Sequence, residues 1–336
     1  MTLVLVLNAG STSLKFGLYR VDGAECETVE SAEGEGNDPA AIADKISAWP
    51  APDIVGHRIV HGGARVRGHC RIDDGVLADL EAAKTLAPLH VPPALAGVRW
   101  ARERFVGAAQ VACLDTAFHA GMPEVATTYP LPGDVRAAGV VRYGFHGLSC
   151  ASIVRQLGLE LPERLVIAHL GGGCSVTAVR AGRSIDTTMG LTPSGGVMMA
   201  TRSGDLDPGV LIYLMREHGM DAGALENLVN RRSGLLGVSN RSGDLRALRE
   251  SPDAAATLAV AMFARSVAKG VVAMMAALGG ADLLVFTGGV GEHDASTRDE
   301  VVGSLGWAGV GGRCAVRALP SREDEEIARI SRGLVE

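Results

Sequence analysis

Side chains that bind metals and phosphates well interrupt an apolar run at the start of the chain. Residues 3–7 are apolar, the bend 8–13 reads NAGSTS, and Lys15 follows within a second apolar stretch. Two glycine-rich bends, 171–173 and 288–291, also follow apolar runs. Backbone amides approach phosphate oxygens closely only where glycine or small residues leave room. Together the three bends favour a phosphate cradle over ordinary turns, although none completes a Walker A or G-x-G-x-x-G motif.

The apolar runs around these bends indicate the elements that position them. Residues 3–7 and 14–19 predict a buried strand and its antiparallel return, and 165–170 and 176–179 repeat that pattern near mid-chain. A third strand, 283–286, leads through glycines into a segment helical from about Asp294. Two strand-bend-strand starts, one in each half, predict a duplicated α/β unit with a ligand cleft between the copies.

Composition narrows the class of protein. The chain has 336 residues, of which 47% are hydrophobic and 21% charged, with 44 glycines, as in a compact α/β protein of two domains. A net charge of -6 without a dense basic block argues against nucleic acid or an anionic membrane as the main partner.

The cysteines and the most apolar segment indicate a cytoplasmic protein. Six cysteines lie singly, without a C-x-x-C pair, which suggests neither a zinc site nor a disulfide framework. The N-terminal apolar run is too short for the core of a signal peptide. Residues 254–280 are strongly apolar, but Arg265 and Lys269 divide them, so we expect a buried helix rather than a membrane span.

Nine motifs, in order along nearly the whole chain, resemble the signatures of the acetate kinase family. They are NAGSTSLKF (8–16), VGHRIVHGG (55–63), LAPLHVPP (86–93), DTAFH (115–119), YGFHG (143–147), HLGGG (169–173), MGLTP (189–193), ATRSGDLDP (200–208) and SGLLGVS (233–239).

This resemblance implies a duplicated actin-like (ribonuclease H-like) α/β kinase fold with two domains and an interdomain cleft. Residues 1–119 would form the first domain, with a C-terminal helix at 324–336 packed back on it, and 120–323 the nucleotide-binding domain. The implied reaction is reversible, in-line transfer of the γ-phosphate of ATP to acetate, giving acetyl phosphate. The resemblance also implies Mg²⁺ or Mn²⁺ and a homodimer.

The resemblance assigns the catalytic residues Arg58, Asp115, His146 and Arg202. Acetate is already ionised at neutral pH, so the main barrier is the repulsion between the acetate anion and the negatively charged phosphates. Positioned cations offset this repulsion. Arg58 would bind acetate, whereas Arg202 and His146 would stabilise the transferring phosphoryl group. We expect Asp115 to orient an arginine or a metal-bound water rather than to transfer a proton.

The resemblance also assigns binding residues. The acid pocket would contain Val60, Leu89, Phe145 and Pro193, with His90 as a further neighbour. Asn8 and Glu323 would hold the metal ion, so that the polar bend faces metal and phosphate. The nucleotide residues would be Lys15, His169, Leu170, Gly171, Gly172, Gly173, Asp244, Leu245, Arg246, Gly289, Val290, Gly291, Glu292 and His293.

Departures from the family pattern leave three functions open. Gly172 and His293 stand where the family has side-chain amides, and the C-terminal PSREDEE differs from the family's motif. The chain could be an acetate kinase, a kinase for propionate or another short acid, or a nucleotide-binding paralogue with weak transfer activity. The four catalytic positions favour an active kinase.

Overall fold

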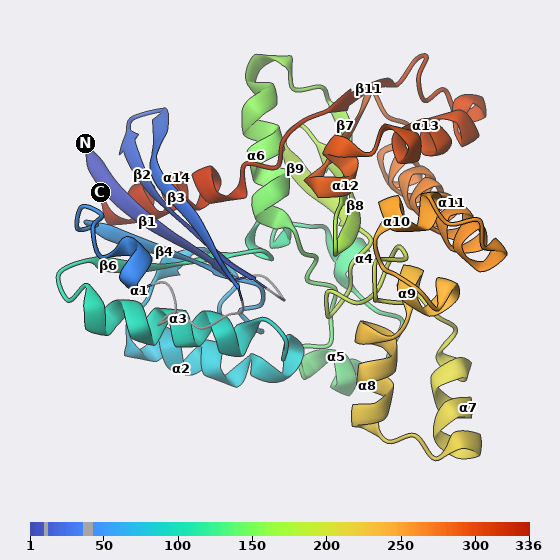
Figure 1. The fold of residues 1–336 in the computed structure, drawn as a ribbon, viewed down its shortest axis with the longest axis horizontal. Helices are drawn as coiled ribbons and strands as arrows, with labels where there is room; N and C mark the ends of the chain where they lie inside the picture. The colour runs from blue at the N-terminus through green and yellow to red at the C-terminus, as the bar shows by residue number, and fades with distance from the viewer. Residues whose placement is uncertain (10–12, 36–42) are drawn as a thin grey trace.

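Two β-sheets with helices around them form the protein (Figure 1). The structure is a computed structural model that describes residues 1–9, 13–35 and 43–336. Gly10, Ser11 and Thr12 of the predicted polar bend lie outside these residues. The strands are β1 (Thr2–Ala9), β2 (Ser13–Asp22), β3 (Glu25–Glu35), β4 (Ile54–Ile59), β5 (Cys70–Arg71), β6 (Ala109–Leu114), β7 (Arg164–Leu170), β8 (Cys174–Arg180), β9 (Arg183–Thr187), β10 (Leu283–Thr287) and β11 (Ala315–Ala318).

Helices account for most of the remaining regular structure. They are α1 (Ala43–Ile46), α2 (Asp74–Ala82), α3 (Val91–Arg104), α4 (Glu124–Thr127), α5 (Gly133–Ala137), α6 (Gly147–Leu157), α7 (Pro208–His218), α8 (Ala222–Arg231), α9 (Gly234–Ser239), α10 (Leu245–Arg249), α11 (Ala254–Leu278), α12 (Gly288–His293), α13 (Ala295–Ser304) and α14 (Glu323–Val335).

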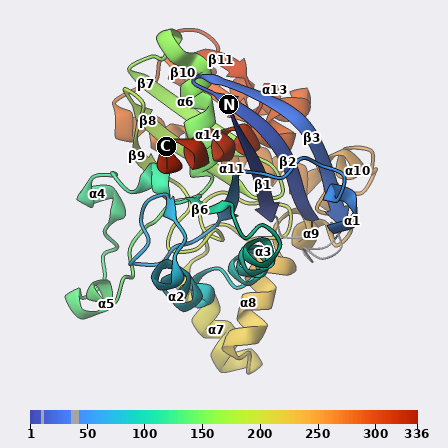
Figure 2. The same cartoon turned by 90° about the vertical axis from the view of Figure 1, so that its left-hand side faces the viewer.

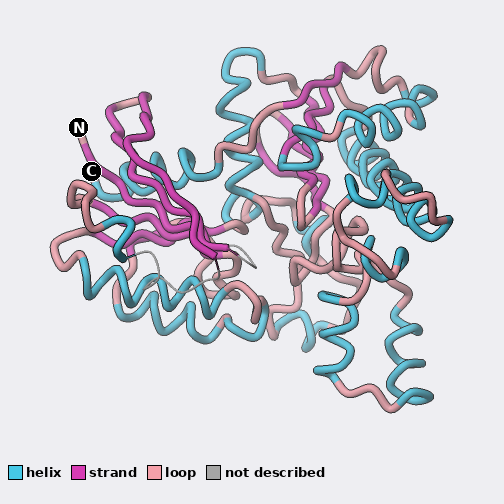
Figure 3. The backbone as a smooth tube through the Cα atoms, viewed as in Figure 1, coloured by secondary structure: helices cyan, strands magenta, loops and turns pink. Residues whose placement is uncertain are grey.

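The two sheets repeat one strand order, as the two strand-bend-strand starts predicted. The first runs β3-β2-β1-β4-β6-β5 and the second β9-β8-β7-β10-β11. In each, the first strand pairs antiparallel with its hairpin partner on one side and parallel with a later strand on the other. Figure 3 shows the strands as two separate groups. The predicted duplicated α/β kinase fold is therefore confirmed.

The central strands are buried on both faces, and their carboxyl ends carry the polar residues. From Val4 to Ala9 and from Leu165 to Leu170 every residue is buried. Such strands read as continuous apolar runs because helices cover both faces of the sheet. In open α/β sheets ligands bind beyond the carboxyl ends of the strands, which is where the predicted glycine bends lie.

Helix α14 packs on the first sheet although it ends the chain. Ile327 and Ala328 of α14 are fully buried in one apolar cluster with Val6 of β1 and Ile54 of β4. Figures 1 and 2 show this helix beside the N-terminal strands, with both chain ends nearby. The division into residues 1–119, 120–323 and a returning C-terminal helix remains a proposal, which these contacts support.

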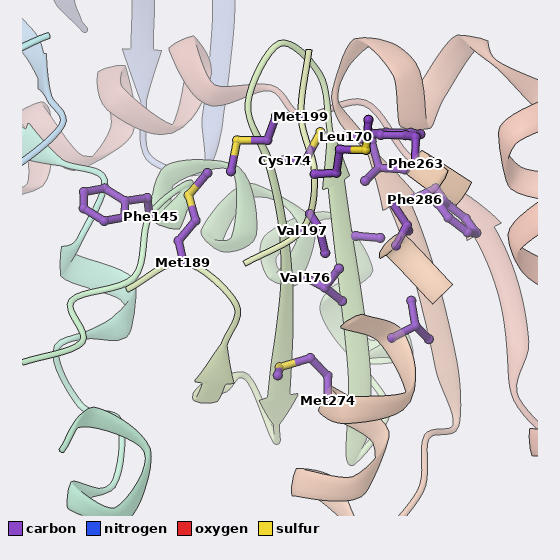
Figure 4. Close-up of a cluster of buried hydrophobic side chains, with 14 of the residues drawn as sticks. Phe145, Leu170, Cys174, Val176, Met189, Val197, Met199, Phe263, Met274 and Phe286 are labelled. Carbon is purple, nitrogen blue, oxygen red and sulfur yellow. The ribbon is translucent and has the colours of Figure 1, made fainter. Parts of the chain in front are cut away.

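The predicted helix at 254–280 is α11, which ends at Leu278 because Gly279 adopts a left-handed conformation. Its Phe263 and Met274 lie in the core with Val176 and Phe286 of the second sheet, as Figure 4 shows. Within the described ranges α11 alone is long and apolar enough to cross a membrane, but 56% of its apolar window is buried in the protein. The helix is less buried than predicted, because its outer face exposes Leu258 and Met262.

The expectation for the third glycine bend was wrong in one detail. The predicted helix near Asp294 is α13, which begins at Ala295 with Asp294 as its N-cap, but the glycines before it start a short helix, α12, at Gly288 directly after β10. Gly288 has a φ of 76°, a conformation that glycine adopts without strain. The chain can therefore turn from strand into helix within one residue, which local apolar patterns do not reveal.

Candidate active site

A cavity of about 530 Å³ opens between the two sheets. The first sheet contributes Asn8, Arg58 and Asp115 from the carboxyl ends of β1, β4 and β6. The second contributes His169 from the end of β7 and the bend 171–173. The volume is typical of a small-molecule site. We call this cavity the cleft.

Arg58 and Asp115 form the main ion pair of the cleft. Nη2 of Arg58 donates to Oδ2 of Asp115 over 2.7 Å, Nε lies 3.1 Å from the same oxygen, and Nη1 donates to Oδ1 of Asn8 over 3.1 Å. Burial alone lowers the pKa of Arg58, but the carboxylates of Asp115 and Glu323 outweigh burial and raise it. Asp115 thus fixes the direction of the guanidinium while Arg58 remains charged.

Arg202 is a buried cation that pairs with no carboxylate of the described residues. It is 9% exposed, and Nη1 donates to the carbonyl of Pro193 over 3.1 Å. Within the described ranges no Asp or Glu pairs with it. Burial lowers the pKa of Arg202, and Arg58 adds repulsion. A buried, unpaired guanidinium is costly unless an anion binds beside it.

His90 contacts Arg202 from the side of the first sheet. It precedes helix α3, and its Nε2 lies 3.4 Å from Nη2 of Arg202. Burial lowers the pKa of His90 to about 3, and the two arginines Arg202 and Arg58 contribute. A neutral imidazole is therefore favoured at this position.

His146 and His169 stack on each other in the cleft. Their ring centroids are 4.1 Å apart with an interplanar angle of 24°. Burial lowers the pKa of His146 well below its usual range, and lowers that of His169 to about 3. His146 also has a φ of 58°, unusual for a residue with a Cβ, and it occupies the N-cap position of α6, where its side chain makes no capping hydrogen bond. Such strained positions concentrate at functional sites.

Three of the four predicted acid-pocket residues line the cleft, namely Val60, Phe145 and Pro193. Leu89 instead lines an adjoining cavity of about 360 Å³, which shares His90, Pro193 and Arg202 with the cleft. Val60 is 3% and Phe145 1% exposed, so both are firmly packed. A small apolar group beside Arg58 would meet these three side chains.

A further cavity, of about 800 Å³, adjoins the cleft through Gly171, Gly172, Ala200 and Gly289. We call it the second cavity, to distinguish it from the adjoining cavity at Leu89. The predicted nucleotide residues that line this second cavity are Gly171, Gly172, Asp244, Leu245, Arg246, Gly289, Val290 and His293. The cleft itself is lined by other predicted nucleotide residues, namely Lys15, His169 and Gly173, together with the shared Gly171, Gly172 and Gly289. Small residues thus join the polar cleft to the second cavity.

Leu170, Gly291 and Glu292 line neither cavity. The side chain of Leu170 is in the core. Glu292 accepts hydrogen bonds from the amides of Gly288 and Ser321, both 3.0 Å, and so joins the third glycine bend to the segment before α14. The assignment of Leu170, Gly291 and Glu292 to nucleotide contacts remains a prediction. For Glu292 the two hydrogen bonds favour a role in supporting the glycine bend.

Asn8 and Glu323 offer oxygen ligands that suit a hard divalent cation. Burial raises the pKa of Glu323 to about 7, and Asp115 and Asp324 add to this against the opposing Arg58. In the described part of the chain the side chain of Glu323 makes no hydrogen bond, and its Oε1 lies 4.0 Å from Nδ1 of His169. A nearby cation would relieve this unpaired carboxylate, so the residues present fit a magnesium ion.

Sequence reasoning missed several residues of the site. Asp324 accepts a hydrogen bond from Nδ2 of Asn8 over 2.7 Å, and Arg249 and Asp294 line the second cavity. Ser175 and Ser149 hold the Nδ1 atoms of His146 and His169 over 2.9 and 2.8 Å. Each serine lies two residues beyond a family motif, YGFHG (143–147) or HLGGG (169–173), but serine in a strand or helix carries no distinctive signal.

Known proteins resemble this chain over almost its full length. Residues 41–327 match the model of the Acetokinase family. The acetate kinase of Rhodopseudomonas palustris (strain TIE-1) is 40% identical over 346 residues, covering 91% of this chain and 87% of that protein.

Solved structures agree with these sequence matches. The crystal structure of Porphyromonas gingivalis acetate kinase has a TM-score of 0.86 and 34% identity, and covers 100% of both chains. That of a propionate kinase from Francisella tularensis has a TM-score of 0.89 and 31% identity, also with 100% coverage. This chain therefore belongs to the acetokinase family.

Proposed function

We propose that this protein transfers the γ-phosphate of ATP to acetate, reversibly, to form acetyl phosphate and ADP. The observation that carries the proposal is Arg202, a buried guanidinium without a carboxylate partner in the described ranges, facing a cleft lined by glycine bends. A transferring phosphoryl group supplies the missing negative charge, and positioned cations are the main source of catalysis in this reaction. Membership of the acetokinase family supports the same chemistry.

Acetate would bind between Arg58 and the apolar wall of Val60, Phe145 and Pro193. Its carboxylate faces the guanidinium that Asp115 holds in place, and its methyl group faces the apolar side chains. One acetate oxygen attacks the γ-phosphorus of ATP, and the bond from that phosphorus to the bridging oxygen of ADP breaks. Acetate needs no deprotonation at neutral pH, so Asp115 is free to orient Arg58.

ATP would extend from the cleft into the second cavity. The amides of Gly172, Gly173 and Gly289 would face the phosphates, whereas the amides of Gly171 and Gly288 already donate to Gly173 and Glu292. Residues 244–246, Val290 and His293 surround space for the nucleoside. Because Gly172 and His293 lack side-chain amides, we expect altered discrimination among nucleotides. Competition kinetics with ATP and GTP measures it, and an undiminished preference for ATP would contradict this expectation.

Asn8 and Glu323 would hold Mg²⁺ or Mn²⁺ together with bound water. The ion offsets phosphate charge when it is bound. Lys15, which is exposed at the rim of the cleft beside Asn8, would contribute a further positive charge to the phosphates.

A kinase for propionate or another short acid is the second candidate. The adjoining cavity at Leu89 lies just behind Pro193 and offers apolar volume. The F. tularensis propionate kinase also shares the fold over the whole chain. The third possibility, a nucleotide-binding paralogue with weak transfer activity, predicts nucleotide binding without acyl phosphate formation.

One assay separates the three candidates. Purified protein is incubated with ATP, Mg²⁺ and each acid from acetate to butyrate, and acyl phosphate is trapped as the hydroxamate. We expect the highest kcat/KM with acetate and a large loss of activity in Arg202→Met. Higher activity with propionate would replace the first proposal by the second. Nucleotide binding without any acyl phosphate would overturn both.

We further propose a homodimer that works in the cytoplasm. Helix α7 contains no buried residue and exposes Val210, Ile212, Tyr213 and Met215, an apolar surface that suits a second copy of the chain. The six free cysteines suit a reducing compartment. Light scattering at several protein concentrations measures the oligomeric state, and a monomer throughout would contradict the dimer.

A further inference from the structure

A buried serine holds the inner nitrogen of His146. The ring lies at the start of α6, and Oγ of Ser175, on β8, is 2.9 Å from its Nδ1. Ser175 is 1% exposed, and this is the one hydrogen bond that its hydroxyl makes in the described part of the chain. The hydroxyl proton is therefore free to point at Nδ1.

The outer nitrogen of His146 faces the cleft. A side chain at Gly173 would begin 3.2 Å from Nε2 of His146 and 3.2 Å from Nη1 of Arg202. Nε2 thus shares with Arg202 the space above the bend 171–173, where we place the transferring phosphoryl group. At that position an N–H stabilises an anion, whereas a bare nitrogen lone pair repels it.

A neutral imidazole has only one N–H, so one ring nitrogen must lack a proton. Burial and the neighbouring cations Arg58 and Arg202 keep His146 neutral. The tautomer of such a ring is set by the hydrogen bond at the other nitrogen. If Nδ1 accepts a proton from Ser175, the ring proton lies on Nε2.

Another buried histidine in this chain shows the same arrangement with its tautomer determined. Nε2 of His119 lies 2.9 Å from the carbonyl oxygen of Phe145, which can only accept, so Nε2 carries the proton. Its Nδ1 must then accept, and its partner there is the hydroxyl of Ser184 at 2.8 Å. A serine donating to Nδ1 is therefore an arrangement that this fold already contains.

We propose that Ser175 is a positioning residue for phosphoryl transfer. By donating its O–H to Nδ1 of His146, it keeps the ring proton on Nε2, aimed at the oxygens of the transferring group, and prevents the ring from flipping. The proposal rests on the proposed role of His146 in transfer. It assigns to Ser175 no contact with substrate.

The first test measures the tautomer without any turnover. Protein labelled with ¹⁵N-histidine is studied by long-range ¹H–¹⁵N correlation NMR without nucleotide, with His146→Gln identifying the His146 signals. We expect a wild-type Nε2–H tautomer and an Nδ1 signal that shifts in Ser175→Ala. A wild-type Nδ1–H tautomer, or an Nδ1 signal unmoved in Ser175→Ala, would overturn the proposal. Because this readout needs no activity, it remains decisive even if the proposed function is wrong.

The second test separates positioning from folding and binding. We expect kcat of Ser175→Ala to fall about tenfold or more, since removal of a whole stabilising donor costs ~10²–10³, while KM for ATP and acetate stays within about twofold. The matched control, Ser184→Ala, removes the same hydrogen bond from His119, whose tautomer the carbonyl of Phe145 still determines. It should retain kcat even if its melting temperature falls. Equal losses of kcat in both variants, or a loss confined to KM, would contradict the role of Ser175.

Discussion

Arg58 and Arg202 face the same cleft but meet different surroundings. Arg58 contacts Asp115, a carboxylate that is 1% exposed, whereas Arg202 is held by the carbonyl of Pro193 and by His90. Removal of Arg58 would leave a buried negative charge without a partner. Removal of Arg202 would instead relieve a buried positive charge. The two variants should therefore lose activity alike and differ in stability.

The first prediction compares Arg58→Met with Arg202→Met. Each should lose about 3 kcal/mol or more of transition-state stabilisation, seen as a fall in kcat/KM of ~10²–10³. Arg58→Met should also lower the free energy of unfolding by about 3–5 kcal/mol, because Asp115 stays buried and unpaired. Arg202→Met should be as stable as the wild type or more so. Turnover and denaturant unfolding measure both effects, and equal destabilisation of the two variants would refute this difference.

The second prediction concerns the backbone of His146. At a φ of 58° and a ψ of 27°, a Cβ is strained, and glycine is also the better N-cap. His146→Gly should therefore be more stable than His146→Ala by about 1 kcal/mol, although both lose activity. Position 152, inside the same helix, is the control, because there Ala should be more stable than Gly. The same order at both positions in thermal unfolding would count against strain at residue 146.

The third prediction concerns the size of the acid. Val60 lines the cleft together with Arg58, and we expect its branched side chain to limit the acid to little more than a methyl group, so that the wild type prefers acetate. Val60→Ala should move the ratio of kcat/KM towards propionate, since one accommodated methylene is worth ~0.8 kcal/mol. The KM for ATP should hardly change. A wild type that already prefers propionate, or a ratio unmoved by the substitution, would show that Val60 does not limit the pocket.

At the scale of elements, α14 contacts the first sheet through a glycine. A Cβ at Gly56 of β4 would lie 2.4 Å from Oγ of Ser331 and 2.8 Å from Cγ2 of Ile327. Both distances are shorter than atoms tolerate, so the helix sits closely on the strand only because residue 56 has no side chain. α14 also begins at Glu323, which ties this packing to the cleft.

The fourth prediction is that Gly56→Ala separates α14 from β4. It should lower the free energy of unfolding by about 1–3 kcal/mol, the usual cost of inserting an atom into a packed core. Gly68→Ala is the matched control, because a Cβ there would meet no atom within 4 Å and its φ is not positive. Urea unfolding of both variants checks the difference. If the two substitutions cost the same, close packing at residue 56 is not the cause.

At the scale of the whole molecule, buried neutral histidines make stability depend on pH. His57 is 1% exposed, with Nε2 donating to Oε1 of Gln110 over 2.8 Å, and burial lowers its pKa to about 4. The unfolded chain binds a proton at His57 below about pH 6.5, whereas the folded chain does so only below about 4. The stability contributed by neutral His57 is thus complete above about pH 6.5, and it is lost as the pH falls from 6.5 to about 4.

The fifth prediction is a smaller acid sensitivity in His57→Gln. From pH 7.5 to pH 5 the wild type should lose about 2 kcal/mol more stability than this variant, because one proton fewer is taken up on unfolding. Denaturant unfolding at several pH values measures the difference. Parallel stability profiles for the two proteins would mean that His57 is not held neutral by burial.

Much of the fold and of the cleft could be predicted because the signals are local. Apolar runs without alternation, each followed by a bend that contains glycine, revealed β1, β7 and β10, and the apolar stretches directly after the first two bends revealed their return strands β2 and β8. Long collinear motifs identified the family and placed Arg58, Asp115, His146 and Arg202 in one cleft. The start of α12 at Gly288 was not predicted from the sequence, because it depends on the left-handed conformation of that single glycine.

Tertiary structure alone decided which partner each site residue meets. Asp115 lies 57 positions from Arg58, and Ser175 lies 29 from His146, so no local pattern links them. The lack of a carboxylate beside Arg202 among the described residues, and the position of Leu89 in the adjoining cavity, likewise depend on how the two sheets face each other. The sequence determined the strands, the bends and the chemical groups through short-range sterics and hydrophobicity. Packing between distant segments determined the protonation and the partners of the site residues, because burial and Coulomb interactions depend on distance in space.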